Sequence, residues 1–68
     1  RPLHKRLSDR EFQVLRLIAS GKTVSGIAEE LSLSVQTIST YRAHILEKMG
    51  LENNAQLTHY VLQHQLVE

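Results

Sequence analysis

The chain has 68 residues, no cysteine, and a formal net charge of +1 when its histidines are neutral. A chain this short supports one small domain, which buries only about 60% of its unfolded surface and is therefore marginally stable. Without cysteine it has neither a disulfide framework nor a thiolate ligand for a metal. No apolar run is long enough for a membrane span or a signal peptide, so we expect a cytoplasmic protein without a membrane partner.

The first six residues, RPLHKR, differ in character from the rest of the chain. They are rich in positive charge, include the single proline, and show no hydrophobic periodicity. We therefore predict a linker at residues 1–6 and a folded domain at residues 7–68. The chain begins without methionine, so we expect it to be the C-terminal domain of a longer protein.

Two helices are predicted in the first half of the chain, at residues 9–20 and 24–31. Ser8, with a glutamate three residues later, forms a capping box at the start of the first helix. Gly21 can adopt the left-handed conformation that ends it. Thr23 is a suitable N-cap for the second helix, in which apolar residues recur at helical spacing.

The third predicted helix covers residues 35–49, with Ser34 as its N-cap and Gly50 as its C-terminal stop. At about 100° per residue, its two sides differ in character. One side is apolar and is expected to face the core, through Ile38, Ile45 and Met49. The opposite side is small or polar, with Gln36, Ser39, Thr40, Ala43 and Glu47. The helix therefore has one side for the core and another for an external partner.

The fourth predicted helix covers residues 54–63, and no strand pattern occurs anywhere in the chain. Its side chains form a stripe at spacings of three and four residues: Leu57, Tyr60, Val61 and His64. We expect Leu57 and Val61 to contribute to the core. The fold class that these elements predict is all-α, a compact bundle of four helices.

Charge is unevenly distributed along the chain. Residues 31–46 contain no acidic side chain, but they include Arg42, His44 and six hydroxyl groups. The seven acidic residues all lie outside this stretch. A polyanion could approach residues 31–46 without repulsion, whereas acidic side chains would repel it from most of the rest of the chain.

The helices at 24–31 and 35–49 are joined by about three residues, which is the spacing of a helix-turn-helix unit. In this unit the second helix lies in the major groove, with its N-terminal half against the base edges. Short side chains on the approaching face let the backbone come close to DNA. Hydroxyl groups can bond to bases or phosphates, and threonine or alanine methyl groups can contact a thymine methyl.

The whole-chain pattern resembles the LuxR/FixJ/NarL-type helix-turn-helix family, the DNA-binding output domain of many bacterial two-component response regulators. The resemblance covers about residues 7–67 and rests on LSDREFQVLRLIASGKTVSGIAEELSLSVQTISTYRAHILEKMG. It implies a four-helix fold that binds double-stranded DNA for transcription regulation, with a phosphoacceptor receiver domain in the missing N-terminal part. An autoinducer-binding domain is the alternative for that part.

The resemblance also implies roles for individual positions. Base contacts are implied for Ser39, Thr40 and Ala43, and Gln36 on the same helix face is a fourth candidate. Phosphate contacts are implied for Thr23, Ser25, Ser34, Thr37, Tyr41, Arg42 and Lys48. A homodimer contact through the helix at 54–63 is implied, with the candidates Tyr60, Val61 and His64. RNA polymerase is left open as a further partner.

Two other interpretations remain. Region four of a sigma factor uses a similar motif, but it would need an arginine-rich recognition helix that this chain lacks. The rival from another class is a helical protein-interaction module that uses the helix at 54–63. No enzymatic activity, cofactor or metal is expected, because there is no phosphate-binding glycine loop and the four histidines lack metal-ligand spacing. The operator, the regulated genes and the sign of the regulation do not follow from the sequence.

Overall fold

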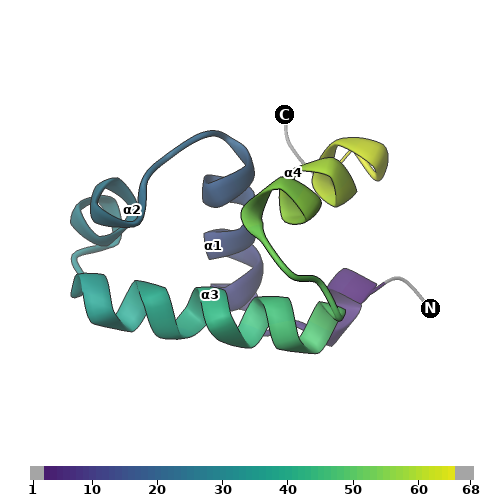
Figure 1. Ribbon diagram of the computed structural model, residues 1–68. Helices are drawn as coiled ribbons and strands as arrows, with labels where there is room; N and C mark the ends of the chain where they lie inside the picture. The colour runs from purple at the N-terminus through teal and green to yellow at the C-terminus, as the bar shows by residue number, and fades with distance from the viewer. Residues whose placement is uncertain (1–2, 66–68) are drawn as a thin grey trace.

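The computed structural model describes residues 3–65, which form helices and connecting turns without a strand (Figure 1). A short 3-10 helix, η1, is followed by four α-helices: η1 Leu3–Arg6, α1 Asp9–Ala19, α2 Val24–Leu31, α3 Val35–Met49 and α4 Asn54–Gln63. The all-α prediction is confirmed. The bounds of α2, α3 and α4 are those predicted, and α1 ends one residue earlier than expected.

Each α-helix begins at a side chain that accepts a hydrogen bond from the backbone of its first turn. These N-caps are Ser8, Thr23, Ser34 and Asn53. The capping box at α1 is complete, because the Glu11 carboxylate also accepts a hydrogen bond from the Ser8 backbone N–H at 2.9 Å. Donors that a helix start would otherwise leave unsatisfied are therefore bonded by residues that the sequence itself specifies.

The turn between α2 and α3 depends on a left-handed residue. Ser32 has φ +57° and ends α2, while the Leu33 N–H donates back to the Ala28 carbonyl at 2.9 Å. A non-glycine residue in this conformation costs about 1–2 kcal/mol. The bend brings Ser34 into position to start α3, which completes the predicted helix-turn-helix unit of α2 and α3.

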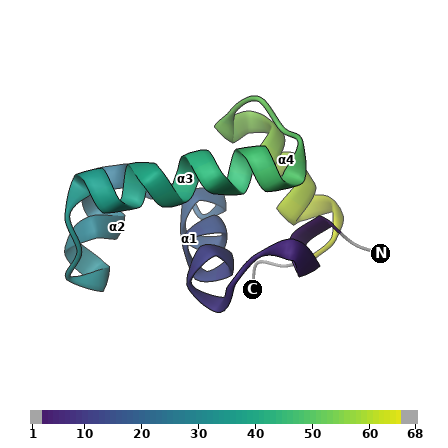
Figure 2. The same cartoon turned by 90° about the horizontal axis from the view of Figure 1, so that it is seen from below.

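The helices are arranged around α3, the longest of them. Figures 1 and 2 both show α1 between α2 and α4, with α3 running across one side of the molecule. One side of α3 therefore faces the other helices, and the opposite side faces away from them. This opposite side is the lower edge of the molecule in Figure 1.

Among the described residues, ten buried apolar side chains form a core that joins the four α-helices. They are Val14, Leu15, Ile18, Ile27, Ala28, Ile38, Ile45, Met49, Leu57 and Val61. The three residues that the helical periodicity assigned to the inner side of α3 are all among them. The core therefore fixes the rotation of α3 about its axis and so decides which residues face outward.

The structure differs from the expected linker at residues 3–6, which form η1, while residues 1 and 2 lie outside the described residues. The His4 backbone N–H donates to the Tyr60 hydroxyl oxygen at 3.3 Å, and His4 Nδ1 lies 3.0 Å from the same oxygen. The His4 ring also lies 5.8 Å from that of Phe12. Contacts with Phe12 in the neighbouring α1 and with Tyr60, 56 residues later in α4, order a segment that has no periodicity of its own.

Titration of His4 is expected to affect stability. Burial, followed by the charges of Lys5 and His64, lowers the pKa of His4 below 6.5. The unfolded chain then binds the proton more readily than the folded chain does. The free energy of unfolding should therefore fall as the pH drops from about 6.5 toward the lower folded pKa, with no further loss below it.

The variant His4→Gln cannot titrate at this position and should lose less stability than the unsubstituted chain between about pH 7.5 and about pH 5.5. Urea unfolding at each pH measures this difference. Parallel pH profiles for the two proteins would contradict the prediction.

Candidate nucleic-acid interface

Four residues predicted to read bases lie together on the outward side of α3. Gln36, Ser39, Thr40 and Ala43 are all exposed, and they lie opposite the three core residues of the same helix. Glu47 is exposed one turn beyond Ala43, so a negative charge marks the C-terminal end of this surface. We call the four residues the outward face of α3.

The hydroxyl of Thr40 is engaged within the helix. Its Oγ1 donates to the Gln36 carbonyl at 3.0 Å, so its proton is not free for an external acceptor. Thr40 therefore offers a methyl group and oxygen lone pairs to a ligand. Ser39 differs, because its hydroxyl has no hydrogen-bond partner within residues 3–65. Ser39 can consequently donate as well as accept.

The N-terminus of α3 lies beside the outward face. Ser34 Oγ accepts a hydrogen bond from the Thr37 backbone N–H at 3.0 Å and donates to Thr37 Oγ1 at 2.8 Å. The two hydroxyl groups thus cap the helix together. The other backbone N–H groups of this first turn lack intrahelical acceptors, and they form the positive end of the helix dipole.

The start of α2 carries two further candidates for phosphate contact. Thr23 Oγ1 accepts a hydrogen bond from the Gly26 backbone N–H at 3.0 Å, while its own hydroxyl proton has no partner in residues 3–65. Ser25 is exposed in the first turn of α2. Both residues precede the helix-turn-helix bend and are accessible to a ligand.

Tyr41 and Arg42 lie on the two flanks of α3, between its inner and outward sides. Tyr41 is half-buried and packs against the core. Arg42 is also half-buried, and its Nε donates to the Asn54 side-chain oxygen at 2.6 Å. Asn54 was not among the predicted site residues, and this contact between α3 and α4 has no signal in the sequence.

His44 is a second residue that the sequence-based site omitted. It is exposed and follows Thr40 by four residues, which places it at the edge of the outward face. His44 lies within residues 31–46, which contain no acidic side chain, and this position could have identified it from the sequence.

Lys48 is placed differently from the prediction. Its Nζ lies 2.8 Å from Oε1 of Glu11, a carboxylate whose side chain is only 5% exposed. The ammonium group therefore bridges α3 to α1 within the domain. Lys48 stabilises the fold as the partner of Glu11, because burial of an unpaired carboxylate is costly, and its predicted phosphate contact stays a prediction.

The ion pair has a predictable dependence on pH. Burial raises the pKa of Glu11, but hydrogen bonds from Lys48 and Ser8 outweigh it, so that the pKa lies below 4.5. A carboxyl group with a lowered pKa stabilises the fold above its unfolded value. This stabilisation is lost as the pH falls from about 4.5 through the folded pKa.

We expect Lys48→Met to lower the free energy of unfolding by about 1–3 kcal/mol at neutral pH, because Glu11 keeps its charge but loses its strongest donor. Urea unfolding measures the loss. Lys22→Met is the matched control, since the Lys22–Glu30 pair is exposed on both sides and contributes little. Equal losses in the two variants would contradict the importance of burial.

The three residues predicted to form a dimer contact on α4 differ in how far the fold exposes them. Val61 is fully buried in the core of the single domain, and its predicted role in a dimer contact stays a prediction. Tyr60 is half-buried under His4. His64 is exposed, and its ring stacks on that of Tyr60 at 4.0 Å. Leu62, which was not among the predicted contact residues, is 63% exposed.

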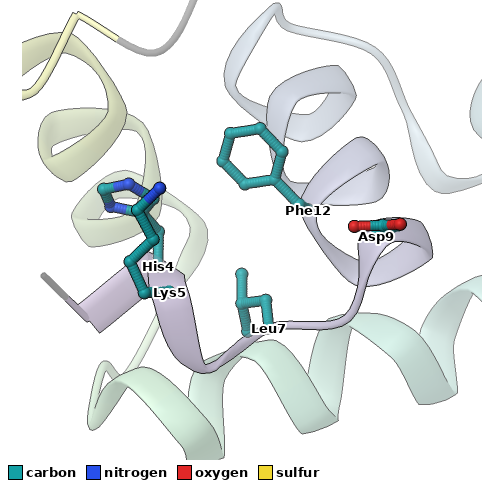
Figure 3. A pocket seen from close by; sticks show the side chains of 5 residues that line it. All are labelled: His4, Lys5, Leu7, Asp9 and Phe12. Atoms are coloured by element: carbon teal, nitrogen blue, oxygen red, sulfur yellow. The ribbon is translucent and has the colours of Figure 1, made fainter.

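Two open pockets flank this region. One, of about 460 Å³, follows α4 and is lined by Leu51, Asn53, Ala55, Gln56, His59, Tyr60 and Gln63. The other, of about 390 Å³, lies between η1 and the start of α1. Figure 3 shows His4 and Phe12 on opposite sides of this second pocket, with Leu7 between them. Neither pocket includes a residue of the outward face of α3.

The described part of the chain contains neither a membrane-spanning helix nor a cluster of metal ligands. No helix within it is long and apolar enough to cross a membrane. No group of three histidine, aspartate or glutamate side chains in residues 3–65 could hold a metal ion.

Comparison with protein families matches residues 5–61 to the model for bacterial regulatory proteins of the luxR family. The chain belongs to this family. The predicted resemblance is thereby confirmed, and the match covers α1, α2, α3 and most of α4. The family is one of regulatory proteins and not of enzymes.

The relatives point to response regulators. The chain is 42% identical over 64 residues to the oxygen regulatory protein NreC of Staphylococcus aureus strain JH9 and, equally, to that of strain USA300. These matches cover 94% of the chain but 30% of each relative, so the chain spans about a third of their length. A solved structure of the two-component response regulator RcsB in complex with DNA has a TM-score of 0.79 at 44% identity, and it covers 84% of this chain and 28% of that one.

Proposed function

We propose that the chain binds double-stranded DNA in a sequence-specific manner and is the output domain of a two-component response regulator. The helix-turn-helix of α2 and α3 inserts α3 into the major groove. The matched structure of a response regulator is itself a complex with DNA, and the family consists of bacterial regulatory proteins. A regulator of this class acts in the cytoplasm, where bacterial DNA lies.

The observation that carries this proposal is the composition and exposure of the outward face of α3. Its four residues are exposed and none of them is acidic, and two of them, Ser39 and Ala43, have small side chains. The helix backbone can therefore approach the base edges closely. Ser39 supplies a free hydroxyl, while Thr40 and Ala43 supply methyl groups that fit thymine.

Phosphate contacts are proposed around this face. Thr23 and Ser25 at the start of α2 contact the backbone on one side of the groove, and the N-terminus of α3 at Ser34 and Thr37 contacts it nearby. Tyr41 and Arg42 follow along α3. These contacts set the orientation of α3, and the outward face selects the sequence.

A homodimer through α4 accompanies DNA binding in the proposal. Tyr60, which is half-buried, and His64, which is exposed, are the predicted contacts that remain accessible, whereas the exposed Leu62 lies on a different side of α4. Two domains related by symmetry would read two half-sites about one helical turn apart. The N-terminal part would be a receiver domain, with an autoinducer-binding domain as the alternative, and RNA polymerase would be a further partner.

An amide chemical-shift titration of the chain with a mixed-sequence duplex, at low and moderate salt, tests the proposal. We expect the largest shifts at residues 34–43 and 22–25, and we expect them to shrink as salt rises because phosphate binding releases counterions. Shifts confined to α4, without salt dependence, would contradict the assignment of α3 as the recognition helix.

That second result would favour a protein-interaction module. The observation that supports this rival function is the 63% exposure of Leu62, on the same helix that lines the larger apolar pocket. Apolar burial responds weakly to salt, so the salt dependence separates the two functions.

A further inference from the structure

Arg42 differs from the other cations of the helix-turn-helix region in how its charge is compensated. Lys22 Nζ lies 3.2 Å from the Glu30 carboxylate, and Lys48 Nζ lies 2.8 Å from that of Glu11. Arg42 makes no ion pair within residues 3–65, and its one hydrogen bond is to a neutral amide. The full positive charge of its guanidinium is therefore available.

The amide belongs to Asn54, the first residue of α4. In Figures 1 and 2 the connection after α3 turns back, so that α4 begins beside the middle of α3. Arg42 Nε donates to Asn54 Oδ1 across this junction at 2.6 Å. The bond uses one of the five N–H donors of the guanidinium, and the four on Nη1 and Nη2 remain in their planar fork.

A neutral acceptor suits a cation that must bind an anion. A carboxylate in the place of Asn54 would hold Arg42 more strongly but would cancel its charge. The amide oxygen fixes the orientation of the side chain and leaves its charge unchanged. Arg42 follows Ser39 by three residues and so borders the outward face of α3, where a DNA backbone would pass.

We infer that Asn54 is a positioning residue for DNA binding, which holds the guanidinium of Arg42 so that its Nη groups contact a backbone phosphate. This inference rests on the proposed function. An arginine side chain that is already fixed loses less conformational freedom when it binds. Asn54 would thereby increase affinity without itself contacting DNA.

Four variants of the chain test the inference by their affinity for a mixed-sequence duplex over a range of salt concentrations. Asn54→Ala should weaken binding by about threefold to tenfold, the effect of releasing one flexible side chain. Arg42→Gln should weaken binding and lower the salt slope by about 0.9, because one phosphate is no longer neutralised. In the double variant, Asn54→Ala should have no further effect.

Asn54→Asp separates positioning from a structural role. An acidic residue in the first turn of α4 should stabilise the helix through its dipole, so weaker binding by this variant would not come from a weakened helix. The inference predicts weaker binding than in Asn54→Ala, because the carboxylate neutralises Arg42. The mobility of the Arg42 Nε–H group, from nitrogen-15 relaxation, should rise in Asn54→Ala and not in Asn54→Asp.

Gln13→Ala is the matched control, since it removes an exposed amide from α1, outside the proposed site. It should leave the affinity unchanged. If the unsubstituted chain binds and Arg42→Gln weakens this binding but Asn54→Ala does not, the positioning role is overturned and the proposed function is not. An Asn54→Ala effect that persists in the Arg42→Gln background would do the same. Absence of salt-dependent binding by the unsubstituted chain would overturn the proposed function as well.

Discussion

Ala43→Glu is expected to weaken DNA binding by at least about 100-fold while leaving the fold intact. Ala43 lies on the outward face of α3, between Ser39 and Glu47 on successive turns. A carboxylate at this position would enter the groove between two rows of phosphates, and opposed like charges in an interface cost several kcal/mol. Every 1.4 kcal/mol corresponds to about a factor of ten in affinity. Fluorescence anisotropy with a labelled duplex measures the loss.

The stability of this variant should change by only about 0.5 kcal/mol. Glutamate is a good helix former, and the new pair with Glu47 four residues later is only mildly repulsive. Ala43→Gln is the control for size, and it should retain much of the affinity because it adds bulk without charge. Equal losses in Ala43→Glu and Ala43→Gln would show that steric fit, and not phosphate repulsion, governs the approach of α3.

Ile45→Ala is expected to have the largest effect on stability, although it lies only two residues from Ala43. Ile45 is fully buried at the centre of the inner side of α3. Its truncation should lower the free energy of unfolding by about 2–5 kcal/mol, because apolar burial is reduced and a cavity is left behind. At about 0.05–0.15 kcal/mol per residue, a domain of 68 residues has only about 3–10 kcal/mol in total.

Ile45→Ala should therefore populate the unfolded state measurably at 25 °C, the temperature to which these estimates refer. Urea unfolding followed by circular dichroism measures the loss. Ile45→Val, which removes a single methylene group, should cost about 0.5–1.5 kcal/mol. A loss in Ile45→Ala no larger than that in Ile45→Val would contradict the close packing of α3 against α1.

The contrast between Ala43 and Ile45 shows how much of the site follows from the sequence. Helical periodicity alone separates the two sides of α3, because residues three and four apart share a side. The caps at Ser8, Thr23 and Ser34 locate the helix starts for an equally local reason, since each bonds within its own first turn. These predictions are confirmed because the interactions behind them span few residues.

The structure adds most at residues whose partners are distant in the chain. Lys48 has the character of a free cation in the sequence, but the fold brings it to Glu11, 37 residues away. Residues 3–6 lack periodicity but are ordered by Tyr60, 56 residues after His4. Val61 belongs to a stripe that could have faced a partner, but the packing of α4 on α1 buries it.

The sequence by itself therefore determined the four helices, the helix-turn-helix and the composition of the outward face of α3, because all of these depend on local spacing. The tertiary structure alone decided which charges remain available. It pairs Lys48 with a buried carboxylate and leaves Arg42 on the neutral amide of Asn54. The physical reason is that the electrostatic environment of a side chain depends on groups within a few ångströms, and the folding of α3 and α4 onto α1 brings those groups together from distant parts of the chain.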